Sequence, residues 1–206
     1  MDLQYRSRPL QVDVNAITIS RQYGAGASEM ARMLSSRFGF RVVEKDLLQA
    51  AAQRSGIDLA KIERVYEQRP GFQDLRVYKE QSEKYITAVN EVLDDLVRQG
   101  SVIIVGRAAN LALLSHPNVF NIRLIADFQV RLKRVMQREV LNEASARQKI
   151  TEADYARETY YRYLYNIMPD DPLVYDMILN TSRMLMEEAA ALVSVSFEAL
   201  RAARSM

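Results

Sequence analysis

A glycine-containing loop between a β-rich run and a helical pattern is the clearest chemical signal in the sequence. The segment I-T-I-S-R-Q-Y-G-A-G-A-S-E-M-A covers residues 17–31. Gly24 and Gly26 allow a tight turn, because no Cβ stands in the way. The N–H groups that start the following helix, together with the helix dipole, attract an anion. We therefore expect a phosphate site made by five consecutive residues: Gly24, Ala25, Gly26, Ala27 and Ser28.

The loop departs from the standard phosphate-binding pattern, G-x-x-x-x-G-K-[ST]. Gly26 matches the second glycine, and Ser28 matches the hydroxyl residue that would hold magnesium. Arg21 stands at the first glycine position and Ala27 at the lysine position. We expect Arg21 to restore part of the missing charge, and a branched side chain at Gly26 to obstruct the phosphate. A plain turn closing a βα unit is the alternative that the loop leaves open.

Arginines that could surround a moving phosphoryl group follow two of the β-rich runs. Phosphoryl transfer needs positive charge held around that group. Arg107 comes directly after V-I-I-V-G, where the carboxyl end of a strand in an open α/β sheet binds ligands. Arg131, Arg134 and Arg138 follow a later run at positions i, i+3 and i+7, so they share one helix face. A surface arginine at a helix start and a solvated charged helix are the respective alternatives.

An acidic and a basic residue lie three positions apart in the segment I-T-E-A-D-Y-A-R, residues 150–157. Thr151 is expected to be a helix N-cap, with Asp154 completing a capping box. Asp154 and Arg157 can then meet on one helix face. The pair either grips the base or sugar of a substrate or is an ordinary helix ion pair. His116, the single histidine, is assigned no role, because one histidine cannot build a metal cluster.

The elements that must position these residues alternate between strand and helix. We expect strands over residues 16–20, 40–43, 102–105, 120–126 and 175–179, separated by helical patterns. This alternation predicts a mostly parallel sheet covered on both faces. Helices are expected over residues 26–38, over 57–67, and in a long stretch ending near 99. The last helix, from about 184, has an apolar stripe that favours packing on the sheet over pairing with a partner helix.

Composition narrows the class of protein further. A chain of 206 residues suits one domain, and a net charge of +2 gives no sign of a nucleic acid polymer as partner. The absence of cysteine excludes disulfides and thiolate metal sites, and it suits a reducing compartment. No apolar run approaches the roughly 20 residues that span a bilayer. We therefore expect a soluble, cytoplasmic protein with no membrane partner.

Five segments, in this order, resemble the cytidylate kinase-like family of P-loop nucleoside monophosphate kinases. They are I-T-I-S-R-Q-Y-G-A-G, V-I-I-V-G-R-A-A-N, R-V-M-Q-R-E, D-Y-A-R-E-T-Y-Y-R-Y and Y-D-M-I-L-N-T-S-R. The resemblance implies a P-loop NTPase fold, three α/β/α layers around a five-stranded parallel sheet in the order 2-3-1-4-5. It also implies ATP with Mg²⁺ as phosphate donor and CMP or dCMP as acceptor.

The resemblance further implies how the chain is organised. A flexible tail over residues 1–15 would precede a single kinase-like domain over residues 16–206. Within that domain, residues 45–100 or so would form a helical insertion on the acceptor side. Residues 127–168 or so would form the lid region.

Roles for individual residues also follow from the resemblance. Arg107 resembles the arginine that binds the acceptor phosphate, and Asp154 with Arg157 resembles the pair that contacts cytidine monophosphate. Three further arginines resemble the lid and phosphate-handling arginines of the family: Arg131, Arg134 and Arg138.

Two departures from the family pattern leave the function open. Ala27 replaces the loop lysine, and E-K-D-L-L-Q-A follows the second strand in place of an acceptor segment with serine and arginine. One hypothesis is an ATP-dependent, cytidylate-type kinase. Another is a nucleotide-binding or regulatory module that has lost catalysis, and a third is a kinase for another small molecule. The retained arginines favour chemistry and the missing lysine favours the module. A homodimer is compatible with the sequence.

Overall fold

The computed structural model describes residues 13–44, 56 and 72–204, and the chain divides into two compact units. Unit 1 consists of Met1–Glu44, Leu93–Ala126 and Pro172–Met206, and unit 2 of Lys45–Val92 and Asp127–Asp171. The helix expected over residues 57–67 and most of the expected N-terminal tail lie outside the described residues.

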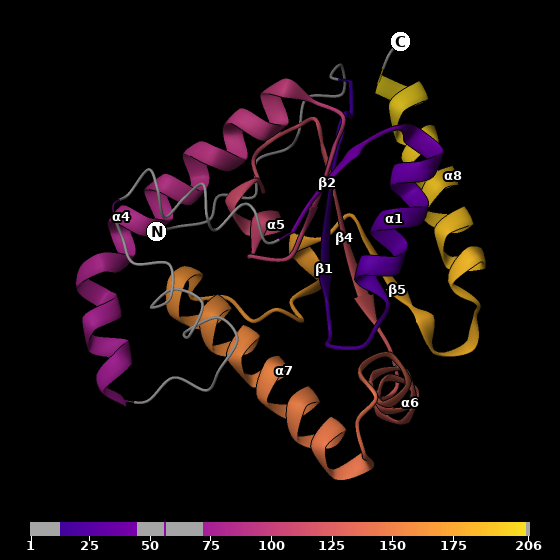
Figure 1. The fold of residues 1–206 in the computed structure, drawn as a ribbon. Helices are drawn as coiled ribbons and strands as arrows, with labels where there is room; N and C mark the ends of the chain where they lie inside the picture. Colours follow the sequence, from indigo (N-terminus) through magenta and orange to yellow (C-terminus); the bar gives the residue numbers. More distant parts are fainter. Residues whose placement is uncertain (1–12, 45–55, 57–71, 205–206) are drawn as a thin grey trace. The chain divides into compact units, whose positions relative to one another are not determined.

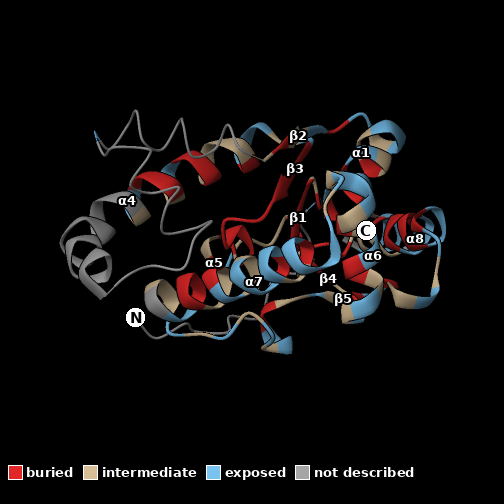
Figure 2. Ribbon diagram, turned by 60° about the horizontal axis from the view of Figure 1, so that its bottom comes forward, coloured by how far each residue is buried: buried red, intermediate tan, exposed pale blue. Residues whose placement is uncertain are grey.

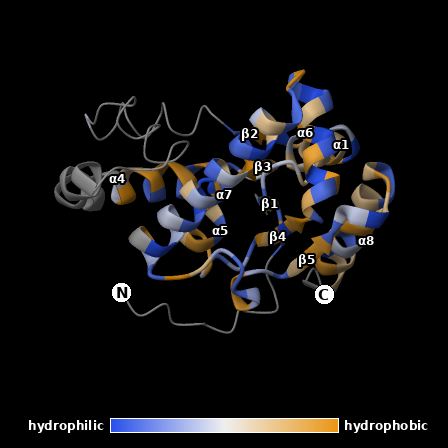
Figure 3. Cartoon of the chain, turned by 90° about the horizontal axis from the view of Figure 1, so that it is seen from below, coloured by the Kyte–Doolittle hydropathy of each residue, from blue (hydrophilic) through white to orange (hydrophobic). Residues whose placement is uncertain are grey.

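A five-stranded parallel sheet forms the centre of unit 1 (Figure 1). Its strands are β1 (Ala16–Arg21), β2 (Arg41–Val43), β3 (Val102–Val105), β4 (Val119–Ile125) and β5 (Met177–Asn180). Neighbouring strands follow the order β2-β3-β1-β4-β5, and every neighbouring pair is parallel. The predicted strands and their order are therefore confirmed, although β5 begins two residues later than expected. Strands β4 and β5 are coloured mainly hydrophobic in Figure 3.

Two helices, α1 (Ala27–Phe38) and α8 (Met186–Arg204), cover one face of this sheet (Figure 1). Helix α1 ends at Gly39, whose left-handed φ of 69° returns its N–H to the carbonyl of Ser35. Four residues of the predicted stripe of α8 lie in the core: Met186, Ala190, Val193 and Phe197. Figure 2 shows buried and exposed residues alternating along α8. This confirms that α8 packs on the sheet.

The other face of the sheet carries α5 (Ala109–Ala112) and the end of α4 (Phe72–Gln99), the predicted long helix (Figure 1). Leu93 and Val97, which belong to the part of α4 inside unit 1, are fully buried. Two short 3₁₀ turns, η1 (Pro172–Val174) and η2 (Thr181–Arg183), flank β5. Helices thus cover both faces of the sheet, as predicted.

Unit 2 contains helices α6 (Phe128–Glu139) and α7 (Glu143–Tyr165). The side chain of Asn142 caps α7 by accepting from the N–H of Ser145. The prediction that Thr151 begins a helix is therefore wrong. Thr151 lies inside α7, where its hydroxyl donates to the carbonyl of Arg147 at 3.0 Å. Within the described part of the chain, no helix is long and apolar enough to cross a membrane.

Candidate functional site

The glycine loop joins the end of β1 to the start of α1 in unit 1. Gly24 and Gly26 adopt left-handed backbone conformations with φ of 84° and 97°, as the loop predicted. Gly26 is also the N-cap of α1, and no side chain caps this helix end. The first N–H groups of α1 therefore keep the capacity to bind an anion.

The missing Cβ of Gly26 faces α8. A Cβ built there would come within 2.1 Å of Met186 Cε and 3.2 Å of Met186 Sδ. The expectation that a branched side chain at this position would obstruct the phosphate therefore needs correction. Such a side chain is directed at the start of α8, and the left-handed φ disfavours it independently.

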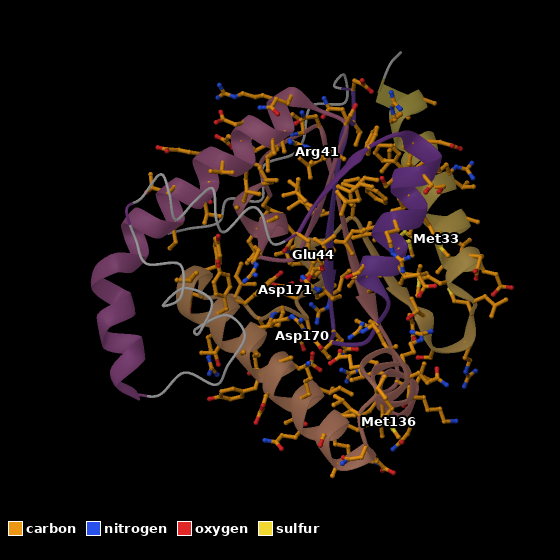
Figure 4. All side chains as sticks on the ribbon, viewed as in Figure 1. Met33, Arg41, Glu44, Met136, Asp170 and Asp171 are labelled. Atoms are coloured by element: carbon orange, nitrogen blue, oxygen red, sulfur yellow. The ribbon has the colours of Figure 1, made fainter. Side chains whose placement is uncertain are left out.

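Glu44 brings Arg21 and Ser28 to one carboxylate. The Ser28 hydroxyl donates to Glu44 Oε1 at 3.0 Å, and Arg21 NH2 lies 3.9 Å from the same oxygen. Glu44 directly follows β2, so it lies at the carboxyl end of the sheet (Figure 4). Our sequence reasoning missed it, although the strand-end rule that singled out Arg107 applies equally to Glu44.

The residues around Glu44 suit a magnesium ion held partly by a nucleotide. Mg²⁺ is commonly bound through one or two carboxylates and through substrate phosphates. The Ser28 hydroxyl and the Glu44 carboxylate are oxygen ligands of this kind, already 3.0 Å apart. The described residues hold no group of three His, Cys, Asp or Glu that could bind a metal by themselves.

Arg107 lies in a strained turn between β3 and α5. Gly106, Arg107 and Ala108 have consecutive φ values of 82°, 60° and 52°. The N–H of Gly106 donates to the carbonyl of Ile19 at 2.9 Å, which ties the turn to β1. Arg107 is only 4% exposed, so the alternative of a surface arginine is wrong. Left-handed conformations in residues other than glycine persist where the surrounding structure fixes them, and they concentrate at functional sites.

Unit 2 contains a second set of predicted residues, centred on Asp154. Its Oδ2 accepts from Arg131 NH1 at 2.5 Å, and its Oδ1 accepts from Arg157 NH1 at 3.4 Å. The predicted meeting of Asp154 and Arg157 on one face of α7 is confirmed. Arg131 also lies over the ring of Phe128, at 5.5 Å from its centroid, and Arg147 lies over the same ring at 5.4 Å. Arg131 is thus held in place from two directions.

The three arginines of α6 differ in burial. Arg131 is 7% exposed, Arg134 is half-buried, and Arg138 is exposed. Arg138 NH2 donates to Glu139 at 2.6 Å. The shared helix face predicted from spacing therefore spans an interior and a solvated environment. The alternative of a solvated charged helix therefore holds for Arg138. Arg131 instead belongs to the cluster around Asp154.

Several solved structures with similar folds are kinases. Shikimate kinase from Acinetobacter baumannii is 14% identical, with a TM-score of 0.50, and the match covers 90% of this chain and 94% of that one. A gluconokinase from Sinorhizobium meliloti, also 14% identical with a TM-score of 0.50, matches over 93% and 95%. An uncharacterized protein from Eubacterium ventriosum has a TM-score of 0.69 at 20% identity, over 89% and 98%. The fold is that of the P-loop kinases.

Sequence similarity identifies the family within the P-loop kinase fold. The model of the cytidylate kinase-like family matches residues 16–183, so the chain belongs to that family. A cytidylate kinase from Methanothrix thermoacetophila is 31% identical, over 90% of this chain and 98% of its own. One from Methanopyrus kandleri is 28% identical, over 89% and 93%.

Proposed function

We propose that this protein is a nucleoside monophosphate kinase that transfers the γ-phosphate of ATP to CMP or dCMP. The observation that carries the proposal is the glycine loop, where the uncapped start of α1 lies beside Arg21, Ser28 and Glu44. Membership of the cytidylate kinase-like family supports the reaction class. The cytidylate kinases among the relatives, 28% and 31% identical, support the acceptor.

The loop residues Gly24 to Ser28 would bind the donor phosphates through their backbone N–H groups. Ser28 and Glu44 would hold Mg²⁺, which neutralises charge on the donor phosphates when it is bound. An oxygen of the acceptor phosphate attacks the γ-phosphorus, the bond from that phosphorus to the β-γ bridging oxygen breaks, and ADP leaves. The protein supplies position and positive charge rather than a covalent partner.

Arg21 would take over part of the charge of the absent lysine. It is the last residue of β1, is 15% exposed at its side chain, and lies 3.9 Å from Glu44. Arg107, buried in its strained turn, would bind the acceptor phosphate. Three arginines of α6 would handle phosphate: Arg131, Arg134 and Arg138.

Asp154 and Arg157 would select cytosine. A carboxylate accepts from the exocyclic amino group of cytosine, and a guanidinium donates to its carbonyl or ring nitrogen. Asp154 is 30% exposed at its side chain, and an ionised carboxylate has about four lone-pair positions. It can therefore keep Arg131 and still accept from a substrate.

The alternative is a nucleotide-binding or regulatory module without catalysis. Ala27 is the first residue of α1 and brings no charge to the loop. The deciding experiment is a screen of purified protein with ATP and Mg²⁺ over all nucleoside monophosphates and over small sugars and other hydroxyl acceptors, with ADP formation and calorimetric binding measured side by side. Faster ADP formation with CMP or dCMP than with other acceptors supports the kinase. Nucleotide binding with no ADP formation establishes the module, and a response to an acceptor outside nucleotides establishes the third hypothesis.

A further inference from the structure

We propose that unit 1 binds a small oxyanion, a phosphate or carboxylate group, on the face of its sheet that carries α5. Five residues form this polar sheet face: Thr18, Ser20, Asn121, Arg123 and Tyr175. This inference does not depend on the proposed kinase activity. It rests on the positive charge of Arg123, which no described carboxylate balances, and on the buried Nδ2 of Asn121, which makes no hydrogen bond within the described residues.

The polar sheet face arises from the alternation of β1 and β4. Thr18 pairs in register with Asn121, and Ser20 with Arg123, so all four side chains point to the same side. Their exposed fractions are 1%, 0%, 5% and 6%, in that order. Central strands of a parallel sheet are normally apolar on both faces. Four buried polar side chains on two adjacent central strands therefore call for a reason.

Arg123 is a buried charge whose partners are neutral. Its NH1 donates to Ser20 Oγ and to the Tyr175 hydroxyl, both at 3.3 Å, and its Cζ lies 5.6 Å from the centroid of the Tyr175 ring. Asp176, the residue after Tyr175, instead accepts from the backbone N–H of Asn121 at 2.7 Å. Among the residues that the structure describes, no carboxylate pairs with Arg123.

A guanidinium cannot shed its proton in a protein, and it carries five N–H donors. A buried charge without a counter-ion is strongly unfavourable, whereas an oxyanion satisfies both the charge and the planar donor fork. The guanidinium of Arg123 is thus suited to bind an oxyanion, and no carboxylate among the described residues takes that place.

Asn121 gives an independent indication on the same face. Its Oδ1 accepts from the Thr18 hydroxyl at 2.5 Å. Within the described part of the protein, its Nδ2 is buried and makes no hydrogen bond. Whichever way the amide is turned, one of its ends stays unmatched, because Thr18 reaches only the other. Asn121 lies two residues before Arg123 on β4, so a ligand with acceptor oxygens could satisfy both side chains.

The polar sheet face is separate from the glycine loop. Ser20 and Arg21 are consecutive in β1, so their side chains point to opposite faces of the sheet. Ser20 contacts Arg123, whereas Arg21 contacts Glu44. Ser20 and Arg123 nevertheless lie near the carboxyl ends of β1 and β4, where open α/β sheets bind ligands. Unit 1 thus has two candidate sites for a negatively charged ligand, one on each face of the sheet.

The test compares wild type, Arg123→Met and the control Arg41→Met by titration calorimetry at constant ionic strength. Arg41 is an exposed arginine on β2 that donates to Gln99, so its loss removes the same charge from another strand. The probes are inorganic phosphate, malonate and CMP. We expect wild type and Arg41→Met to bind phosphate alike and Arg123→Met to bind it at least tenfold more weakly.

The outcomes of this titration either refute the proposal or identify the kind of anion that binds. Equal phosphate affinity in wild type and Arg123→Met overturns the proposal, and so does a wild type that binds none of the three probes. Arg123-dependent binding of CMP assigns the site to a nucleotide phosphate, whereas dependence for phosphate or malonate alone assigns it to a free oxyanion. Binding of a non-hydrolysable ATP analogue, measured separately, reports on the glycine loop. The result for the polar sheet face can therefore be interpreted even if the kinase proposal fails.

Stability provides a second measurement on the same variants. Without added anion, Arg123→Met should be at least as stable as wild type, because it removes an uncompensated buried charge. Phosphate should raise the thermal midpoint of wild type by more than that of Arg123→Met, in which only the glycine loop remains to bind it. If Arg123→Met does not fold, Tyr175→Phe keeps the ring and removes one hydroxyl. It should weaken phosphate binding by about threefold or more, and unchanged binding in that variant counts against the site.

Discussion

Replacing Glu44 with glutamine should change nucleotide binding in opposite directions with and without Mg²⁺. The substitution keeps the size of the side chain and removes the negative charge that contacts Ser28 and Arg21. Without metal, that charge repels the phosphates of ATP. With metal, it is proposed to hold the ion. The sign of the effect therefore depends on the metal.

The magnitudes follow from exposure and charge. Glu44 is 37% exposed at its side chain, so its interactions are closer to the aqueous limit than to the buried one. At that limit, two unit charges about 4 Å apart repel by about 1 kcal/mol, which is about fivefold in affinity. Glu44→Gln should therefore bind ATP about fivefold more tightly in EDTA. With Mg²⁺ it should bind at least roughly tenfold more weakly than wild type, because even residues that only support a metal ligand cost about that much when replaced.

The assay is titration calorimetry of ATP, once in EDTA and once in excess Mg²⁺. Glu29→Gln is the matched control, because Glu29 is exposed, follows Ser28 in the first turn of α1 and loses the same charge. It should not reverse the order of affinities between the two conditions. If Glu44→Gln binds more weakly in both conditions, or more tightly in both, Glu44 does not serve the metal. Glu44→Gln should change the free energy of unfolding by less than about 1 kcal/mol, because the ion pair between Glu44 and Arg21 is partly exposed.

Three further substitutions test the site. Gly26→Ala should lower the free energy of unfolding by about 1–2 kcal/mol in urea denaturation, since φ is 97°; rescue by Met186→Ala would instead attribute the loss to the clash. Asp154→Asn should reduce the ratio of kcat/KM for CMP over UMP and cost about 1–3 kcal/mol of stability, because Asp154 neutralises two arginines; an unchanged ratio in folded protein assigns the residue to structure alone. Arg21→Ala should lower kcat more than Arg41→Ala, and equal turnover in the two variants refutes the role of Arg21.

The sheet was predictable because each strand is a short apolar run bounded by turn residues. The start of α7 was not. T-E-A-D at residues 151–154 has the pattern of a capping box, and the real cap at Asn142 has an equally local signal. The choice between a start at Thr151 and a start at Asn142 is made only by the observed helix, which begins at Glu143. Thr151 is therefore an interior residue, and its hydroxyl donates to the carbonyl of Arg147. Local cap patterns predict that a helix can start, but two such patterns nine residues apart leave the actual start undecided.

The candidate site was predictable where it follows one continuous segment. The loop from Gly24 to Ser28 and the pair of Asp154 and Arg157 are of this kind. Glu44 was missed because its role depends on the proximity of β2 to the start of α1, sixteen positions away from Ser28 in the sequence. Arg123 was missed because a single arginine inside an apolar strand reads as an interruption. Its meaning depends on pairing with Ser20 across the sheet.

Glu44 also bears on the proposal that Arg21 supplies charge in place of a loop lysine. A lysine at position 27 would place its charge at the helix start, whereas Arg21 holds a guanidinium at the end of β1 and shares Glu44 Oε1 with Ser28. In the free protein, Glu44 partly neutralises Arg21 and restrains it. If Glu44 holds Mg²⁺ as proposed, it would interact less with Arg21, and the guanidinium would then be available for the phosphates. Arg21 and Glu44 should therefore be coupled in a double-substitution cycle of ATP affinity in Mg²⁺. Additive effects of Arg21→Ala and Glu44→Gln would show that the arginine acts independently of the carboxylate.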